Sequence, residues 1–189
     1  MDFRTIIATI ILETGRFLFG WWNDIRKKKL ELRDAENLEK ILQVSECLDH
    51  IRRKTQAVRV VMVRCNNNGK EIKPGVTWYG TITDETTKDN WEPAKPYFNR
   101  LELDDDYKRR VVMLMKLGSV LIKKNELKEG TLICDVFNHD GIKSGYAHKI
   151  KYGPKKQHFL ICQYDTPEPS ARSIHIAKTQ AAKIIRLME

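Results

Sequence analysis

The densest group of potentially metal-binding side chains in this sequence is the run Asp104, Asp105 and Asp106. Carboxylate oxygens bind divalent cations, but three consecutive residues cannot all converge on one ion, and no further ligands follow at a suitable spacing. The run directly precedes an apolar-periodic segment, Tyr107 to Leu117. Carboxylates at that position cap a helix and complement its positive N-terminal end. We therefore predict a helix cap here and no metal site.

Residues able to perform acid–base chemistry are present, but not in catalytic arrangements. The sequence contains no GxSxG, HExxH, Walker A or dinucleotide-binding glycine motif. His139 and Asp140 form a turn dipeptide. His148, His158 and His175 fall at expected strand or helix positions, where structural histidines outnumber catalytic ones. We predict no catalytic residues, no cofactor and no enzymatic activity.

The cysteines indicate a reducing compartment. None shares a CxxC spacing and each lies inside an apolar run, which favours buried free thiols over zinc ligands or disulfides. The four are Cys47, Cys65, Cys134 and Cys162. The apolar N-terminal stretch does not read as a secretory signal, because Glu13 and Arg16 interrupt it and no small-residue cleavage site follows. We expect a cytoplasmic location, with the cytoplasmic face of a membrane as one form of it.

The chain of 189 residues has a formal net charge of +9, with 41% hydrophobic and 31% charged residues. This length fits one domain plus an appendage, and the composition leaves no tract that must be disordered. The positive charge favours anionic partners such as lipid headgroups, nucleic acid or acidic protein. Nucleic-acid binding ranks below the other functions, because no stacking aromatic side chains alternate with the basic ones. Its candidate residues are Lys151, Lys155, Lys156, Arg172 and Lys178.

The first segment of the chain is predicted to be an apolar helix with a basic end. From Phe3 to Ile25, apolar residues recur at steps of three and four, the spacing of one helix face. Such a face needs a cover, because it would otherwise expose a continuous apolar patch. We predict that this helix contacts a membrane or partner helices. The residues assigned to that contact are Phe3, Ile7, Ile10, Phe17, Trp21, Trp22, Arg26, Lys27, Lys28 and Lys29.

Three ways of burying the apolar face of this helix remain open. The tryptophan pair Trp21 and Trp22 beside the basic run resembles an aromatic anchor at an anionic bilayer surface. Steps of four and three also suit an oligomeric helical seam, as in a coiled coil, and packing within the chain is the third cover. A full membrane span is less attractive, because Glu13 and Arg16 would lie near mid-bilayer. We expect a homo-oligomer.

The rest of the chain reads as a connector helix followed by an α+β body. Residues 30–56 contain neither Gly nor Pro and carry an apolar face. The predicted organisation is therefore an N-terminal helix at 1–29, a connector at 30–56 and a domain at 57–189. The expected body elements are strands at 58–63 and 76–82, a loop at 83–96, a helix at 107–117, a strand at 119–122, a helix at 130–137, strands at 142–151 and 158–164, and a helix at 170–188.

This order of elements resembles a GAF domain over residues 38–189. Three stretches carry the resemblance: Val58 to Gly69, Glu129 to Leu132 leading into Gly141 to Tyr146, and Phe159 to Cys162 followed by the helix ending at Ile185. The resemblance implies an antiparallel sheet flanked by helices. It also implies a ligand-sensing or dimerising module whose N-terminal helices carry input or output, and it implies no reaction.

We predict that the body is a non-catalytic sensor with a pocket over the antiparallel sheet, bounded by the 83–96 loop. The pocket would bind a small molecule and shift the N-terminal helices. The candidate lining residues are Trp78, Tyr79, Trp91, Tyr97, Phe98, Tyr146 and His148. The alternative is a structural or adaptor protein, in which the body presents surfaces and the N-terminal helix assembles copies or docks on a larger machine. A core filled by side chains would favour that alternative.

Overall fold

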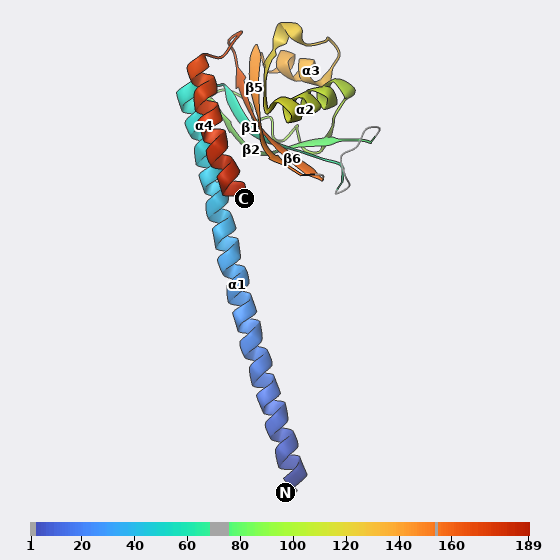
Figure 1. Ribbon diagram of the computed structural model, residues 1–189, viewed down its shortest axis with the longest axis vertical. Helices are drawn as coiled ribbons and strands as arrows, with labels where there is room; N and C mark the ends of the chain where they lie inside the picture. The colour runs from blue at the N-terminus through green and yellow to red at the C-terminus, as the bar shows by residue number, and fades with distance from the viewer. Residues whose placement is uncertain (1–2, 69–75, 154) are drawn as a thin grey trace. The chain divides into compact units, whose positions relative to one another are not determined.

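The computed structural model describes the backbone of residues 3–68, 76–153 and 155–189, and their side chains except those of 3–21, 23, 24 and 152. Four α-helices and six strands make up this part of the chain (Figure 1). In order they are α1 (Phe3–Thr55), β1 (Arg59–Asn66), β2 (Tyr79–Thr87), β3 (Leu101–Glu102), α2 (Asp105–Leu117), β4 (Ser119–Lys123), the 3-10 turn η1 (Lys124–Glu126), α3 (Leu132–His139), β5 (Ser144–Tyr152), β6 (Lys156–Tyr164) and α4 (Ala171–Met188).

Helix α1 is continuous where the sequence predicted two helices. Residues 21–55 contain no Gly or Pro to break it, and the basic run within them is compatible with helix. The chain divides into two compact units, Met1–Leu42 and Gln43–Glu189, so the end of α1 belongs to the second unit. Within the part of the chain that the structure describes, no helix combines the length and apolar character needed to cross a membrane.

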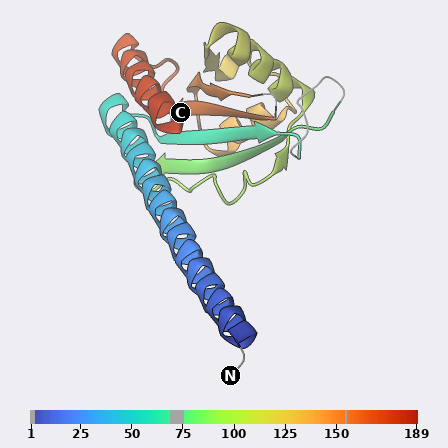
Figure 2. The same cartoon turned by 60° about the horizontal axis from the view of Figure 1, so that its bottom comes forward.

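The six strands form one antiparallel sheet in the order β3-β2-β1-β6-β5-β4. Figure 2 shows β1 and β2 side by side. The β-branched run of β1 pairs with β2 on one edge and with β6 on the other. This confirms the predicted α+β class with an antiparallel sheet. Strand β2 continues to Thr87, so the loop that follows spans 88–100 instead of 83–96.

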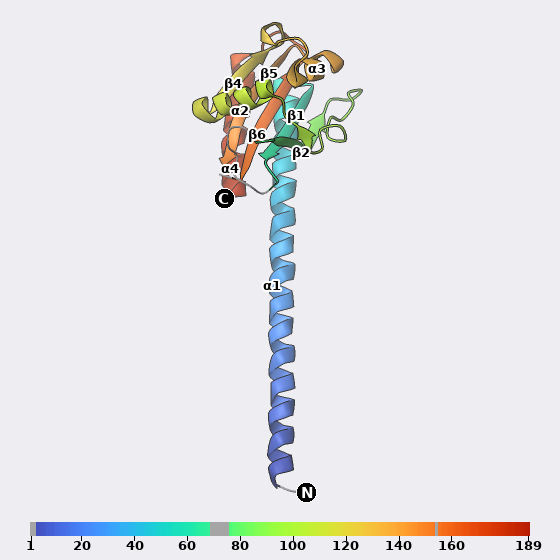
Figure 3. The same ribbon diagram turned by 90° about the vertical axis from the view of Figure 1, so that its right-hand side faces the viewer.

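Helices cover both faces of the sheet. Helices α2 and α3 lie on one face, in front of the sheet in Figure 3, and α4 lies behind it. The core under α2 and α3 includes Val61, Val63 and Phe159, whereas their neighbours Met62 and Leu160 belong to the core under α4 and the end of α1. The alternation of strand side chains therefore produces two separate cores.

The Asp104 carboxylate joins α2 and α3, which cover the same face of the sheet. Its Oδ1 accepts a hydrogen bond from the backbone N–H of Tyr107 at 2.7 Å, which caps α2. Its Oδ2 accepts one from the N–H of Leu132 at 2.7 Å, at the start of α3. Gly118 ends α2 with φ +78°, a conformation that glycine adopts without strain. The predicted cap is thus present and serves two helix N-termini.

Replacing Asp104 should destabilise the fold, because Asp104→Ala leaves two helix N–H groups without an acceptor. Losing one such cap costs about 0.5–2 kcal/mol, so we expect a loss of about 1–3 kcal/mol for the two together. Urea unfolding followed by circular dichroism measures it. Asp105→Ala is the matched control, since that exposed side chain pairs only with Lys108 at 3.3 Å. Equal losses in the two variants would contradict the double-cap role.

Candidate functional site

A partly open cavity of about 70 Å³ lies between the sheet and helices α2 and α3. Its walls are almost entirely apolar. They come from Val61 and Val63 on β1, Val111 and Leu114 on α2, Ile133 and Phe137 on α3, and Phe159 and Ile161 on β6. Arg59 and Gln163 supply polar groups to the same lining. A void with apolar walls stays dry and suits an apolar guest.

Arg59 is buried in the sheet, with only 1% of its surface exposed. Its Nη1 donates to Asp140 Oδ2 at 2.6 Å and to Gln163 Oε1 at 3.2 Å. Its Nη2 donates to the Glu92 carbonyl oxygen at 2.6 Å, and its Nε lies 3.2 Å from Glu85 Oε1. One guanidinium therefore connects β1, β2, β6, the 88–100 loop and the end of α3.

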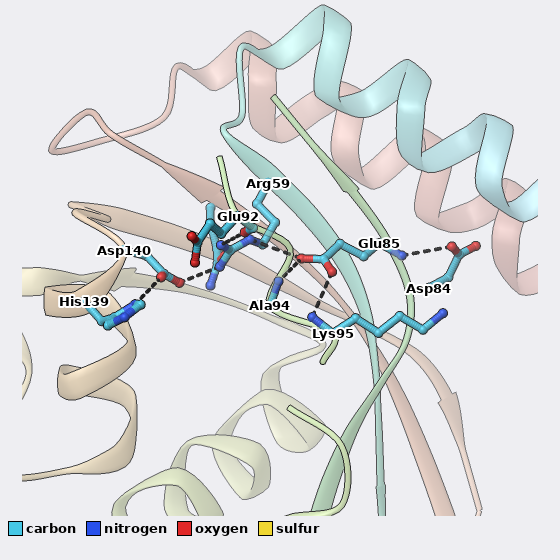
Figure 4. Close-up of polar contacts among 9 residues, drawn as sticks. Arg59, Asp84, Glu85, Glu92, Ala94, Lys95, His139 and Asp140 are labelled. Carbon is cyan, nitrogen blue, oxygen red and sulfur yellow. Dashed lines mark hydrogen bonds and ion pairs between the residues drawn. The ribbon is translucent and has the colours of Figure 1, made fainter. Parts of the chain in front are cut away.

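Glu85 extends this network into the loop, as Figure 4 shows. Its Oε1 accepts a hydrogen bond from the Ala94 N–H at 2.8 Å, and its Oε2 accepts one from the Lys95 N–H at 2.9 Å. Its side chain is 6% exposed, so the ion pair with Arg59 is largely shielded from water. This carboxylate and the hydrogen bond from Arg59 to the Glu92 carbonyl both hold the loop that borders the cavity to the sheet.

Asp140 lies at the other end of the network. It lies at the C-terminal end of α3, where a negative charge is unfavourable on its own. Arg59 compensates for this position, and His139 Nδ1 lies 2.8 Å from Asp140 Oδ1. Among the described residues that line the cavity, the charged side chains are Arg59 and Arg110. Both are paired with carboxylates, Arg59 with Glu85 and Asp140 and Arg110 with Asp106 at 2.9 Å.

A β-bulge determines which side chains face the cavity. Strand β2 pairs Val63 with Ile82 but Met62 with Asp84, so Thr83 is an extra residue. The extra residue shifts the alternation of β2 by one. As a result Glu85 faces the cavity side with Arg59, whereas Asp84 faces α1. Without the bulge, the two acidic residues would exchange faces.

The cavity offers no acid, base or nucleophile that titrates near neutral pH. Among the described residues that line it, the ionisable side chains are Arg59, Arg110 and Tyr107. Burial raises the pKa of the Tyr107 phenol far above its usual value. In the same core, burial raises the pKa of the Cys65 thiol to about 12, so this thiol is not a thiolate at neutral pH. The arrangement is suited to binding.

Three of the seven predicted ligand residues lie in or beside the core under α2 and α3. Phe98 is buried and lines the cavity. It lies against Gly80, where an added Cβ would meet the Phe98 ring at 2.7 Å, so the close approach requires glycine. Trp78 is buried in the same core and Trp91 packs against it, but neither lines the cavity.

The other four predicted ligand residues are not brought to the cavity. Tyr97 is 72% exposed, and the Arg100 guanidinium lies over the Tyr79 ring at 5.3 Å. Tyr146 and His148 point to the opposite face of the sheet, where the Tyr146 hydroxyl lies 3.2 Å from His148 Nδ1. Any contact of these side chains with a ligand stays a prediction that this geometry does not support.

The predicted membrane or partner residues are described only in part. The side chains of Phe3, Ile7, Ile10, Phe17 and Trp21 lie outside the described residues. Trp22 is 54% exposed and has the Arg26 guanidinium 5.6 Å from its ring centroid. The basic residues 27–29 are exposed. Their contact with a membrane or with other helices stays a prediction.

The cluster of Arg59, Glu85 and Asp140 was not predicted from the sequence. One signal was available, because Arg59 interrupts the β-branched run of β1 and shares its face with Val61 and Val63. A charged residue on the apolar side of a buried strand needs a partner, since burying an unpaired charge is costly. Its partners were not identifiable, because they lie on separate elements far along the chain.

No protein-family model matches the chain, and no curated protein does. The fold is similar to solved GAF domains. The phycocyanobilin-bound GAF domain of a cyanobacterial phytochrome has a TM-score of 0.55 at 12% identity, over 86% of this chain and 90% of that one. The third GAF domain of Slr1393 from Synechocystis sp. PCC6803, in its photoproduct state, gives 0.53 at 17% identity, over 75% and 88%. The phycoerythrobilin-bound GAF domain of a cyanobacterial phytochrome gives 0.54 at 10% identity, over 82% and 90%. The predicted GAF-like fold is confirmed.

The prediction of no cofactor is wrong for a domain of this fold. Two of the similar GAF domains are bound to phycocyanobilin and phycoerythrobilin, so the fold accommodates a prosthetic group. A bilin, however, does not fit the cavity of this chain. Sites for drug-sized ligands measure roughly 300–1,000 Å³, whereas this cavity measures about 70 Å³. A bound molecule here must be much smaller than an open-chain tetrapyrrole.

Removing the buried cation should destabilise the chain strongly. Arg59→Met leaves Glu85 and Asp140 without their shared partner, and breaking a buried ion pair in this way costs about 3–5 kcal/mol. Urea unfolding at neutral pH measures the loss. The control is Arg64→Met on the same strand, for which we expect about 1 kcal/mol or less.

Proposed function

We propose that this chain is a non-catalytic GAF-like sensor whose cavity binds a small, neutral, apolar molecule. The observation that carries the proposal is the partly open apolar cavity between the sheet, α2 and α3, which Arg59 also lines. Its size limits the ligand to a few heavy atoms, and the two arginines that line it already have carboxylate partners, which favours a neutral ligand. The photosensory GAF domains of similar fold support a sensory role.

The structural effect of a ligand in the cavity would reach α1 through two adjacent residues of β2. Glu85 faces the cavity network and Asp84 faces the other side of the sheet. The Glu85 N–H donates to Asp84 Oδ1 at 2.9 Å, and the Ser45 hydroxyl on α1 donates to Asp84 Oδ2 at 2.7 Å. A ligand that moves Arg59 or the 88–100 loop would shift this chain of hydrogen bonds. The part of α1 within the second unit then receives the signal.

The N-terminal part of α1 would tether the sensor to a membrane surface or to partner helices, on the cytoplasmic side. Two features support this role: the exposed Trp22 with Arg26 beside it, and the basic residues 27–29. The adaptor function is the second candidate. The small volume of the cavity favours it, because a nearly filled core presents surfaces without needing a ligand.

Small apolar probes should bind in the cavity. Xenon and benzene occupy dry apolar cavities, so we expect xenon to shift the NMR resonances of the methyl groups on β1, α2 and α3. Ala147→Leu, which fills the cavity, should abolish those shifts. Ala182→Leu on the exposed face of α4 is the matched control and should leave them unchanged. Ala94→Leu is a second filling variant, because it enters the cavity from the loop instead of the sheet.

Failure of both probes to bind a folded wild-type chain would overturn the sensor function and favour the adaptor. The size limit is tested with biliverdin. We expect the chain to acquire no visible absorbance band from biliverdin, and a stable band would contradict the proposed ligand class.

Benzene should also slow amide hydrogen exchange in residues 88–100 and 43–55, because both segments are linked to the cavity through Glu85 and Asp84. Asp84→Ala removes the acceptor of the Ser45 hydroxyl, so slowing at 43–55 should be lost while slowing at 88–100 persists. Asp89→Ala in the exposed loop is the control. Persistence of the effect at 43–55 in Asp84→Ala would exclude this route.

A further inference from the structure

The exposed middle of α1 carries a seam with heptad spacing. Residues taken from 25 to 42 at alternating steps of three and four lie on one stripe of a supercoiled helix. The stripe consists of Ile25, Lys28, Leu32, Ala35, Glu39 and Leu42. All are exposed, and the large apolar members Ile25, Leu32 and Leu42 are 46%, 67% and 57% exposed. Leu30 and Ile41 lie outside this stripe.

The seam is complementary to itself when a second copy runs in the opposite direction. The residue numbers of facing positions then add to the same value. Ile25 faces Leu42 of the second copy, Leu32 faces Ala35, and Lys28 faces Glu39. The two polar positions therefore meet as opposite charges, and each occurs twice by symmetry. Beside the seam, Lys29 lies near Glu36 of the second copy, which adds two further attractive pairs.

A parallel arrangement in register lacks this complementarity. It would place Lys28 against Lys28 and Glu39 against Glu39, each within the apolar seam. It would also place Glu31 beside Glu36 across the interface, a like-charge contact. Charge patterns that repel one pairing while attracting another determine the orientation of coiled coils. The same six residues thus favour one orientation and oppose the other.

We infer that residues 25–42 of α1 form a two-stranded antiparallel coiled coil with a second copy of this chain. Its two-fold axis passes between residues 33 and 34, and Lys28 with Glu39 sets the register. The inference concerns α1 alone and holds whether or not the cavity binds a ligand. Two polar layers among six make the association weak, so the dissociation constant falls between about 1 µM and 1 mM.

Charge exchange at the seam tests the orientation. In the full chain, Lys28→Glu makes residue 28 of each copy face Glu39 of the other, so the dimer gains two like-charge contacts. The dimer dissociation constant, measured by sedimentation equilibrium, should rise about tenfold. The double variant Lys28→Glu with Glu39→Lys restores both pairs and should return it to near the wild-type value. Lys27→Glu is the matched control, because it changes the net charge equally outside the seam. In a parallel dimer the double variant gives no rescue.

Disulfide trapping provides a second readout. The native cysteines of the described chain are buried. Tagged Lys28→Cys and untagged Glu39→Cys chains, mixed and oxidised with diamide, should give the mixed disulfide. Two copies of Lys28→Cys should not cross-link, because eleven residues separate the sites along the axis, roughly 16 Å, and a disulfide needs Cα atoms about 4–7 Å apart. Cross-linking of Lys28→Cys with itself, a monomer up to about 1 mM, or a larger oligomer overturns the inference.

Discussion

The fold around the cavity depends on the burial of one charged side chain, Arg59. Desolvating a guanidinium is costly, and replacing such an ion pair by apolar residues is often neutral or stabilising. Net stability is therefore a poor explanation for its position. What Arg59 provides is connection, because its donors reach Asp140, Gln163 and the Glu92 carbonyl, and its Nε faces Glu85. These groups belong to β2, β6, the 88–100 loop and the end of α3, so one side chain of β1 contacts all four.

The contacts of β2 with Arg59 and with α1 both follow from the extra residue Thr83. The bulge sets Glu85 on the Arg59 side and leaves Asp84 to accept from Ser45. Two neighbouring carboxylates of one strand then hold two different layers of the domain. Each carboxylate has a directional partner on its own side of the sheet, Arg59 for Glu85 and Ser45 for Asp84.

Elements with a clear period were predictable from the sequence, but the site was not. The β-branched run gave β1, and the carboxylates with the following apolar spacing gave α2 and its cap. The predicted loop began too early, since Thr83 to Thr87 continue β2 although their polarity suggested a turn. The ligand residues were chosen for aromatic character, yet Phe98 and Tyr146 lie on opposite faces. Aromatic content carries no information about which side of a bulged or twisted sheet a residue occupies. Asp140 and Gln163 lie 81 and 104 residues from Arg59, so only the fold brings them together.

In the middle of α1, the order of the charged residues specifies a direction of pairing more clearly than the apolar periodicity does. Its exposed apolar residues do not form one stripe, since Leu30 and Ile41 lie off the seam. Apolar contacts of this kind support association without choosing a direction. The order of charges supplies the choice, since Lys28 and Glu39 are symmetric about the midpoint of the seam.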